Sequence, residues 1–119
     1  MQVVYHANYL VWCEIGRTEF IREVWGSYAD VERGGVALAV VDASLRYHAP
    51  ARYDDLVRVT TTVREVKSRT VIFDYKLENA TTGQRLASAS TTLIAFTREA
   101  TVTVLPPEMR IALEQQVAP

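Results

Sequence analysis

The residues best suited to chemistry lie at the very start of the chain, in the stretch VVYHANYLVWCE. Tyr5 and His6 directly precede a run with helical spacing, and Asn8 is a residue type that caps helices. The first turn of a helix offers free backbone N–H groups and the positive end of the helix dipole, which together stabilise an oxyanion. We therefore predict that the backbone N–H of His6, or of its neighbour, polarises a carbonyl group.

The side chains in this stretch leave alternatives open. The imidazole of His6 can itself hydrogen-bond a substrate or tune a carboxylate, or it can simply pack or cap at the helix start. His6 and His48 are the only histidines, and neither has cysteines or carboxylates at ligand spacing, so we predict no metal site. Cys13 lies on the apolar stripe of the helix and is expected to be a core residue rather than a reactive thiol.

The elements that must position these residues follow from periodicity. A helix is predicted from about Asn8 to Trp25, with charged residues on its far side. The helix stripe contains Tyr9, Trp12, Cys13, Gly16, Phe20 and Val24, and the opposite positions carry Glu14, Arg17, Glu19 and Arg22. Gly16 has no side chain, so a sheet can approach closely there.

The rest of the chain changes to strand patterns. Val and Thr enrichment, alternation and turn residues predict four long strands, joined mainly by hairpins. They cover Val36–Asp42 continuing through Ser44–His48, Leu56–Val66, Val71–Leu77 and Arg85–Thr97, and Pro106-Pro107 opens a short final helix with Met109 and Leu113 on one side. The fold class is therefore α+β, with a helix across an antiparallel sheet. Such a small domain leaves sheet edges uncovered, which favours a homodimer or a dimer of dimers.

Composition excludes several classes of protein. The net charge is -1 without a basic stripe, which argues against nucleic acid as a partner. No apolar run has the length of a membrane helix, and no signal peptide is evident, so neither membrane insertion nor secretion is expected. The single cysteine cannot form an intrachain disulfide, and a cytoplasmic location fits this composition.

The motif of the first twenty residues resembles the 4-hydroxybenzoyl-CoA thioesterase family, with the Tol-Pal-associated bacterial acyl-CoA thioesterases as the most similar branch. That branch has a motif like D-x-x-x-V-V-Y-H-x-N-Y, followed by a helix with aromatic-x-E-x-x-R. The matching residues are Val3, Val4, Tyr5, His6, Asn8, Tyr9, Trp12, Glu14 and Arg17. A second stretch, Tyr47 to Val63, matches at Pro50, Ala51, Tyr53, Asp54 and Asp55. The resemblance implies a hotdog fold, hydrolysis of an acyl-CoA substrate and no separate cofactor.

One departure from the family stands out. The family's catalytic Asp lies seven residues before the position of His6, which falls upstream of Met1. We therefore expect residues 1–119 to form a single hotdog domain that lacks the first strand and the Asp that follows it. A second branch of hotdog thioesterases has its carboxylate on the helix itself, about two turns past the oxyanion donor, and Glu14, eight residues after His6, resembles that arrangement. Glu14 is therefore a rival base, and the alternative is an ion pair with Arg17 or a contact with Thr18. Without the Asp, a non-catalytic acyl-CoA-binding or scaffold protein is the alternative function.

Further residues are candidates for catalysis or for contacts with the substrate. Tyr5, His6 and Glu14 are the catalytic candidates, and Asn8 is expected to hold the helix start against the substrate. Arg58, Lys67 and Arg69 are candidates for CoA phosphate contacts, although charged strands and hairpins are usually just solvated, as we also expect for Arg64. Ser88, Ser90 and Thr91 are candidates to line a pantetheine passage. We do not expect a serine nucleophile, because no nucleophile-elbow motif and no partner histidine is evident.

Overall fold

The computed structural model describes residues 7–26 and 35–117. The predicted first helix is confirmed as α1, Ala7–Val24, and the final helix as α3, Pro107–Glu114. The four predicted strands are β1 (Val36–Tyr47), β2 (Val57–Val66), β3 (Thr70–Asn79) and β4 (Arg85–Thr97). The α+β prediction is therefore correct, with element ends within about two residues of those expected.

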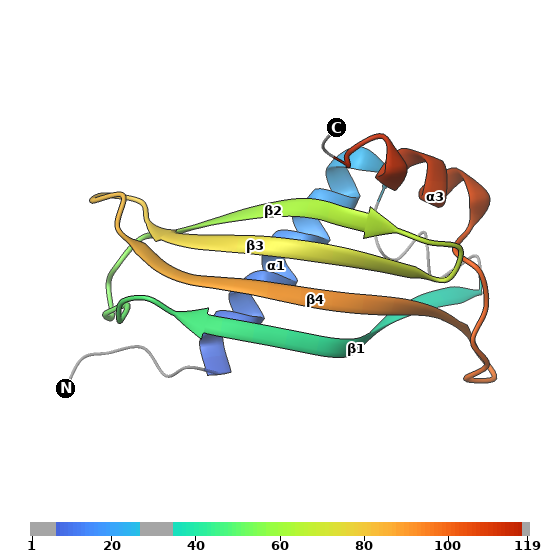
Figure 1. Ribbon diagram of the computed structural model, residues 1–119, viewed down its shortest axis with the longest axis horizontal. Helices are drawn as coiled ribbons and strands as arrows, with labels where there is room; N and C mark the ends of the chain where they lie inside the picture. The colour runs from blue at the N-terminus through green and yellow to red at the C-terminus, as the bar shows by residue number, and fades with distance from the viewer. Residues whose placement is uncertain (1–6, 27–34, 118–119) are drawn as a thin grey trace.

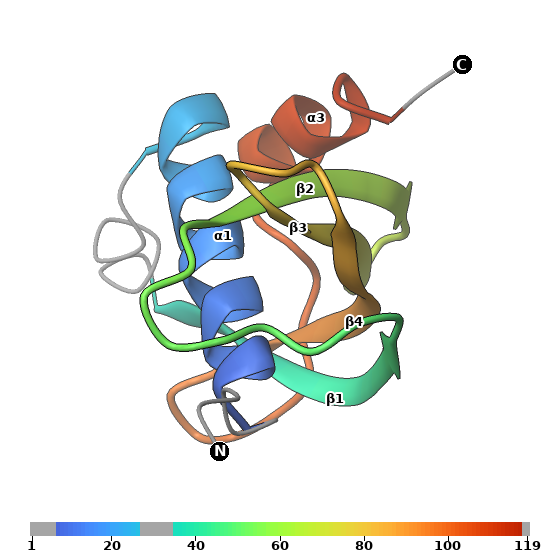
Figure 2. The same ribbon diagram turned by 90° about the vertical axis from the view of Figure 1, so that its left-hand side faces the viewer.

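The four strands form one antiparallel sheet in the order β1-β4-β3-β2. Figure 1 shows α1 crossing behind all four strands, and Figure 2 shows the sheet curling around the helix, with β2 and β1 at its two edges. The two predicted segments of the first strand are a single strand with a register shift between Val40 and Asp42. Such an irregularity bends a strand and increases its twist, as a curling sheet requires.

The core fills the space between α1 and the concave face of the sheet. Alternate residues of β3 point to this inner face and are buried, including Val71, Phe73, Tyr75 and Leu77. The small residues predicted at the centre of β4 serve the same packing, because Ala87 and Ala89 are buried under the helix. Met109 and Leu113 of α3 are fully buried, as the predicted one-sided pattern of that helix requires.

The close approach of helix and sheet occurs at Gly16. A Cβ atom built on Gly16 would lie 2.7 Å from Thr61 Oγ1 and 2.8 Å from Val59 Cγ1, both on β2. These distances are shorter than side-chain contacts tolerate, so the backbone of α1 can rest on β2 only because this position carries no side chain. The prediction that Gly16 permits close packing is confirmed.

The predicted orientation of one residue of α1 is wrong. Arg17 was expected on the solvent side, but its Nη1 donates to the hydroxyl of Tyr75 on β3 at 3.1 Å. Ile21, which the predicted stripe omitted, is buried instead. The sheet wraps around the helix, so the covered arc of α1 is wider than a single narrow stripe.

We predict that Gly16→Ala destabilises the fold. Alanine is intrinsically better than glycine in a helix by about 1 kcal/mol, so any loss reports the clash with Thr61 and Val59. We expect the free energy of unfolding in urea to fall by about 1–3 kcal/mol. Thr18→Ala, at an exposed position of the same helix, is the control and should change little. A Gly16→Ala variant as stable as the parent would contradict the close approach.

Candidate active site

The helix starts within one residue of the predicted position, and the residues that precede it are not described. Tyr5 and His6 lie outside the described residues. α1 begins at Ala7, so its first backbone N–H groups have no partner within the helix. A capping residue directly precedes the first helical residue. Asn8 is instead the second residue of α1 and is exposed, so the prediction that it caps this helix is wrong.

The first turn of α1 is held by the buried side chain of Tyr9. The Tyr9 hydroxyl accepts a hydrogen bond from the backbone N–H of Ala51 at 2.9 Å. The Tyr9 ring lies 5.1 Å from the rings of both Trp12 and Tyr47, measured between centroids. These contacts tie the helix start to the end of β1 and to the loop that leads into β2.

That loop is internally braced. The backbone N–H of Arg52 donates to Asp55 Oδ2 at 2.8 Å, and the N–H of Asp55 donates to the Arg52 carbonyl at 3.1 Å. Asp54 adopts a positive φ of 73°, which closes the turn between them. The predicted loop is therefore an ordered turn next to the helix start, and Asp55 is the carboxylate that it presents to the neighbouring groove.

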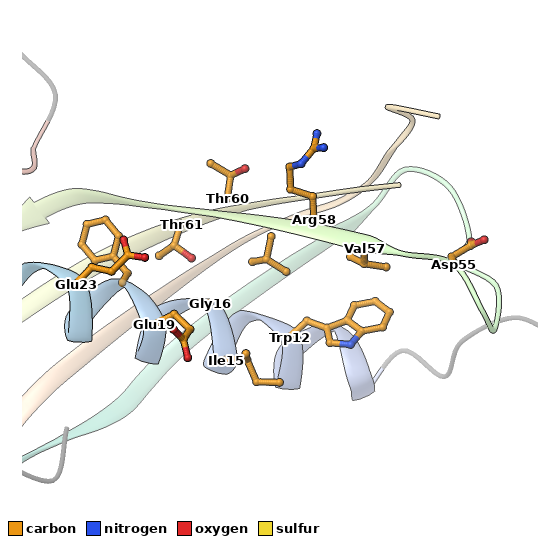
Figure 3. Close-up of a pocket in the computed structure, with 12 residues that line it drawn as sticks. Trp12, Ile15, Gly16, Glu19, Glu23, Asp55, Val57, Arg58, Thr60 and Thr61 are labelled. Atoms are coloured by element: carbon orange, nitrogen blue, oxygen red, sulfur yellow. The ribbon is translucent and has the colours of Figure 1, made fainter. Parts of the chain in front are cut away.

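A groove of about 660 Å³ runs between α1 and β2 (Figure 3). Apolar side chains from both elements line it, together with Asp55 and Arg58 at the strand side and two glutamates at the helix side. β2 is an edge strand, so the groove opens along backbone groups that pair with no described strand. The hydroxyl of Thr61 is buried there without a hydrogen-bond partner among the described residues. The groove lining comprises Trp12, Ile15, Gly16, Glu19, Phe20, Glu23, Asp55, Val57, Arg58, Val59, Thr60 and Thr61.

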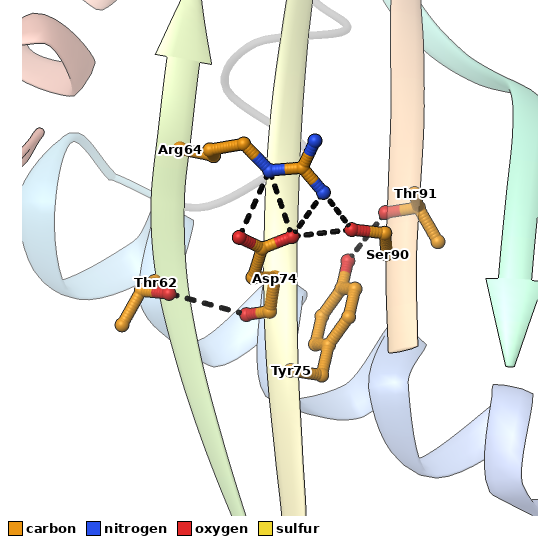
Figure 4. Close-up of polar contacts among 6 residues, drawn as sticks. All are labelled: Thr62, Arg64, Asp74, Tyr75, Ser90 and Thr91. Atoms are coloured by element: carbon orange, nitrogen blue, oxygen red, sulfur yellow. Dashed lines mark hydrogen bonds and ion pairs between the residues drawn. The ribbon is translucent and has the colours of Figure 1, made fainter. Parts of the chain in front are cut away.

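A polar chain crosses the core beneath α1. Arg17 donates to the Tyr75 hydroxyl, which lies 2.7 Å from Thr91 Oγ1 on β4 (Figure 4 shows the Tyr75–Thr91 contact). Burial raises the pKa of Tyr75, although the hydrogen bonds to Thr91 and Arg17 oppose the shift. These two hydrogen bonds join the helix to the two central strands and fix how α1 is rotated about its axis.

This arrangement decides part of the prediction for Glu14. Arg17 is turned toward Tyr75, and the exposed Glu14 makes no ion pair with any residue that the structure describes. The expected Glu14–Arg17 ion pair is therefore wrong. Among the described residues, the carboxylate of Glu14 has no cationic partner.

Cys13 is a core residue, as predicted. Its side chain is fully buried. Burial raises the pKa of the Cys13 thiol to about 11, and the positive charge of Arg17 only partly opposes this shift. A buried thiol that stays protonated at neutral pH is not a nucleophile.

The predicted phosphate-binding residues are separated by the length of β2. Arg58 lies at the start of β2, where its backbone borders the groove that Trp12 also lines, but its side chain points away from α1 (Figure 3). Lys67 and Arg69 lie in the hairpin at the other end, where Lys67 contacts Glu65 at 3.5 Å and the carbonyl of Ser68 accepts from the N–H of Leu105. The structure therefore directs none of these three cationic groups toward the first turns of α1, because Arg58 faces the other side of β2 and Lys67 and Arg69 lie at its far end.

The three hydroxyl residues proposed for a pantetheine passage face opposite ways. Thr91 is buried on the inner face and bonds to Tyr75, whereas Ser88 and Ser90 point to the outer face of the sheet. A strand alternates its side chains between faces, so residues 88 and 91 cannot line one passage. This part of the prediction is wrong.

The outer face contains contacts that sequence analysis missed. Arg64 and Asp74 form an ion pair, and Ser90 contacts both (Figure 4). The hydrogen bond from Arg64 lowers the pKa of Asp74. His48 Nε2 lies 3.0 Å from Ser88 Oγ, so a histidine does stand beside a serine, contrary to expectation. These partners are far apart in the chain, and only the strand register brings them together.

The described residues contain no group of three or more metal-ligating side chains. None of the described helices is long and apolar enough to cross a membrane.

The chain matches the family described as the Thioesterase superfamily over residues 1–85, and it belongs to that family. The family assignment and the structural relatives confirm the predicted hotdog fold.

Individual relatives agree with this assignment. The putative acyl-CoA thioesterase YneP of Bacillus subtilis is 38% identical over 79 residues, which are 66% of this chain and 57% of that protein. The acyl-CoA thioester hydrolase YbgC of Escherichia coli O157:H7 is 33% identical over 78 residues, 66% of this chain and 58% of that protein. The chain thus spans a little over half the length of these curated relatives.

Solved structures match over more of the chain. The hypothetical protein TT1821 from Thermus thermophilus superposes with a TM-score of 0.91 and 31% identity, covering 100% of this chain and 88% of that one. The DHNA-CoA thioesterase from Staphylococcus aureus gives a TM-score of 0.90 and 28% identity, covering 97% of this chain and 79% of that one.

Proposed function

We propose that this protein hydrolyses acyl-CoA thioesters, and that the backbone N–H groups at the start of α1 polarise the thioester carbonyl. The observation that carries the proposal is the anchored first turn of α1, held by the hydrogen bond between Tyr9 and Ala51. A fixed helix start keeps its N–H groups oriented before the charge develops, which is the condition for strong oxyanion stabilisation. Membership of the Thioesterase superfamily supports the same chemistry.

In this reaction water adds to the carbonyl carbon, the C–S bond breaks, and the CoA thiolate leaves and takes up a proton. A carboxylate removes the proton from water, or attacks the carbonyl itself to give an anhydride that water then opens. The negative charge on the carbonyl oxygen rests against the N–H of His6 or its neighbour. The imidazole of His6 is the alternative group for contact with substrate or carboxylate, and Tyr5 adjoins it.

The carboxylate is proposed to be the Asp of the family motif, on polypeptide that precedes residue 1. The groove beside β2 supports this proposal, because its free strand edge and apolar floor suit one further strand ahead of α1. Glu14 is the rival base, and the absence of an ion pair to any residue in the described part of the chain favours keeping it under test.

Within the superfamily, we propose membership of the branch that resembles 4-hydroxybenzoyl-CoA thioesterases and the Tol-Pal-associated enzymes. The identity to YbgC supports this placement. The cytoplasmic location stays a prediction from the sequence.

A thiol-release assay with benzoyl-CoA and aliphatic acyl-CoAs tests the carboxylate. We expect residues 1–119 alone to hydrolyse these substrates poorly, and a version extended upstream with the motif Asp to be active.

In the extended version, Asp→Asn should remove most of the turnover. His6→Ala should remove much less, because the backbone N–H of residue 6 is kept. Glu14→Gln should match its control Glu99→Gln, at an exposed position in the turn after β4. Robust turnover by residues 1–119 that disappears in Glu14→Gln would make Glu14 the base.

We further propose that two copies join along β1, an edge strand of the described sheet, into one continuous sheet. β1 has β4 on one side and no described strand on the other, and its Val40 and Val41 expose 46% and 58% of their surface. Unpaired edges with apolar side chains are covered in stable proteins, most simply by a symmetric copy. A dimer of dimers would use a second surface.

Sedimentation velocity at micromolar concentration tests the dimer. We expect the parent chain to sediment as a dimer or larger, and Val41→Lys to shift it toward monomer, because the interface would bury an unpaired charge. Ile111→Lys, at an equally exposed apolar position on α3, is the control and should leave the association unchanged. A folded parent chain that sediments as a monomer would contradict the proposal.

A further inference from the structure

The outer face of the sheet, on the side away from α1, places a serine between two cations. The register of β1 on β4 sets Arg46 opposite Ser88, and the register of β3 on β4 sets Lys76 opposite the same serine. Directly opposed residues of antiparallel strands share a face, with their Cβ atoms about 5 Å apart. Ser88 is therefore flanked on both sides by positive side chains on one surface.

The next row of residues adds more positive charge than negative. Glu78 of β3 lies opposite Arg58 on β2 and opposite Arg85 on β4. Glu78 also contacts Lys76, at 3.7 Å between Oε1 and Nζ. This row thus holds one carboxylate and, with Lys76, three cations, although the whole chain carries a net charge of -1. We call the surface formed by Arg46, Arg58, Lys76, Arg85 and Ser88 the basic face.

The nearest other carboxylate does not neutralise this surface. Asp74 is engaged by Arg64, and the hydrogen bond between them keeps the pKa of Asp74 low. Arg46 forms no ion pair with any residue in the described ranges, and its exposed guanidinium keeps its five donors available. A bound anion is what would balance this excess of charge.

The same region is hollowed and carries oriented polar groups. A depression of about 510 Å³, the size of a small-molecule site, is lined by Ser44, Leu45, Arg46, Asp74, Tyr75, Ser88, Ala89 and Ser90. His48 lies within hydrogen-bond distance of Ser88, so the hydroxyl of Ser88 is held in place at the floor of the basic face. The depression and the oriented Ser88 hydroxyl distinguish this surface from a sheet face that only contacts solvent.

We propose that the basic face binds the phosphate group of a small soluble phosphomonoester. Arg46 offers the planar fork of donors that matches phosphate oxygens, Lys76 adds a point charge from the other side, and Ser88 donates from below. The site lies on the opposite side of the sheet from α1, so it does not depend on the proposed thioesterase chemistry.

The probe is inorganic phosphate, titrated into the 119-residue chain against chloride at constant ionic strength and followed by amide and imidazole NMR shifts. We expect saturable shifts at Ser88, Arg46 and His48. Arg46→Gln should raise the dissociation constant for phosphate about tenfold, which is the usual effect of losing one charged hydrogen bond. Arg98→Gln removes an exposed arginine from the turn after β4, outside the basic face, and should bind as the parent does.

Three results would overturn the proposal. The first is the absence of any saturable shift with phosphate in a protein whose spectrum is folded. The second is equal phosphate binding by Arg46→Gln and Arg98→Gln, which would make the effect general screening. The third is co-sedimentation with phosphatidylcholine vesicles containing phosphatidic acid but no response to inorganic phosphate, which would assign the surface to a membrane. Ser88→Ala is the second variant, and a folded Ser88→Ala protein with unchanged affinity would remove the serine from the site.

Discussion

The contact between the backbone of α1 and β2 at Gly16 is the constraint on which the rest of the structure depends. Any side chain at this position would meet Thr61 and Val59 at less than 3 Å. With only hydrogen there, the helix sinks into the concave face of the sheet, and the sheet can curl around it. The buried core of the domain, from Phe73 to Met109, fills the space that this curvature creates.

Two further contacts convert that packing into a defined site. The Arg17–Tyr75–Thr91 chain fixes the rotation of α1 over the central strands. At the first turn, the hydrogen bond from Ala51 to Tyr9 fixes where the helix begins. Oxyanion stabilisation depends on donors that need not reorganise during the reaction. The proposed mechanism therefore depends on the contacts that orient α1 as well as on the N–H groups at its start.

The sequence predicted the elements well because their patterns are local. The helix, the four strands and the role of Gly16 follow from periodicity and residue type. Prediction from the sequence failed for contacts that depend on strand register or on the curvature of the sheet. Arg17 faces the sheet because the wrapped sheet covers a wide arc of α1. The His48–Ser88 contact arises because β1 and β4 pair in one particular register, and no local pattern encodes that pairing.

The central claim is that the start of α1 polarises the substrate carbonyl, and the vibrational frequency of that carbonyl tests it most directly. The probe is a ketone analogue of acyl-CoA, with a methylene in place of sulfur and a ¹³C label at the carbonyl, bound to the upstream-extended protein. Isotope-edited infrared difference spectra should show the C=O stretch at lower frequency when bound than in water, because fixed N–H donors withdraw electron density from it. A bound carbonyl with the frequency it has in water would contradict the account.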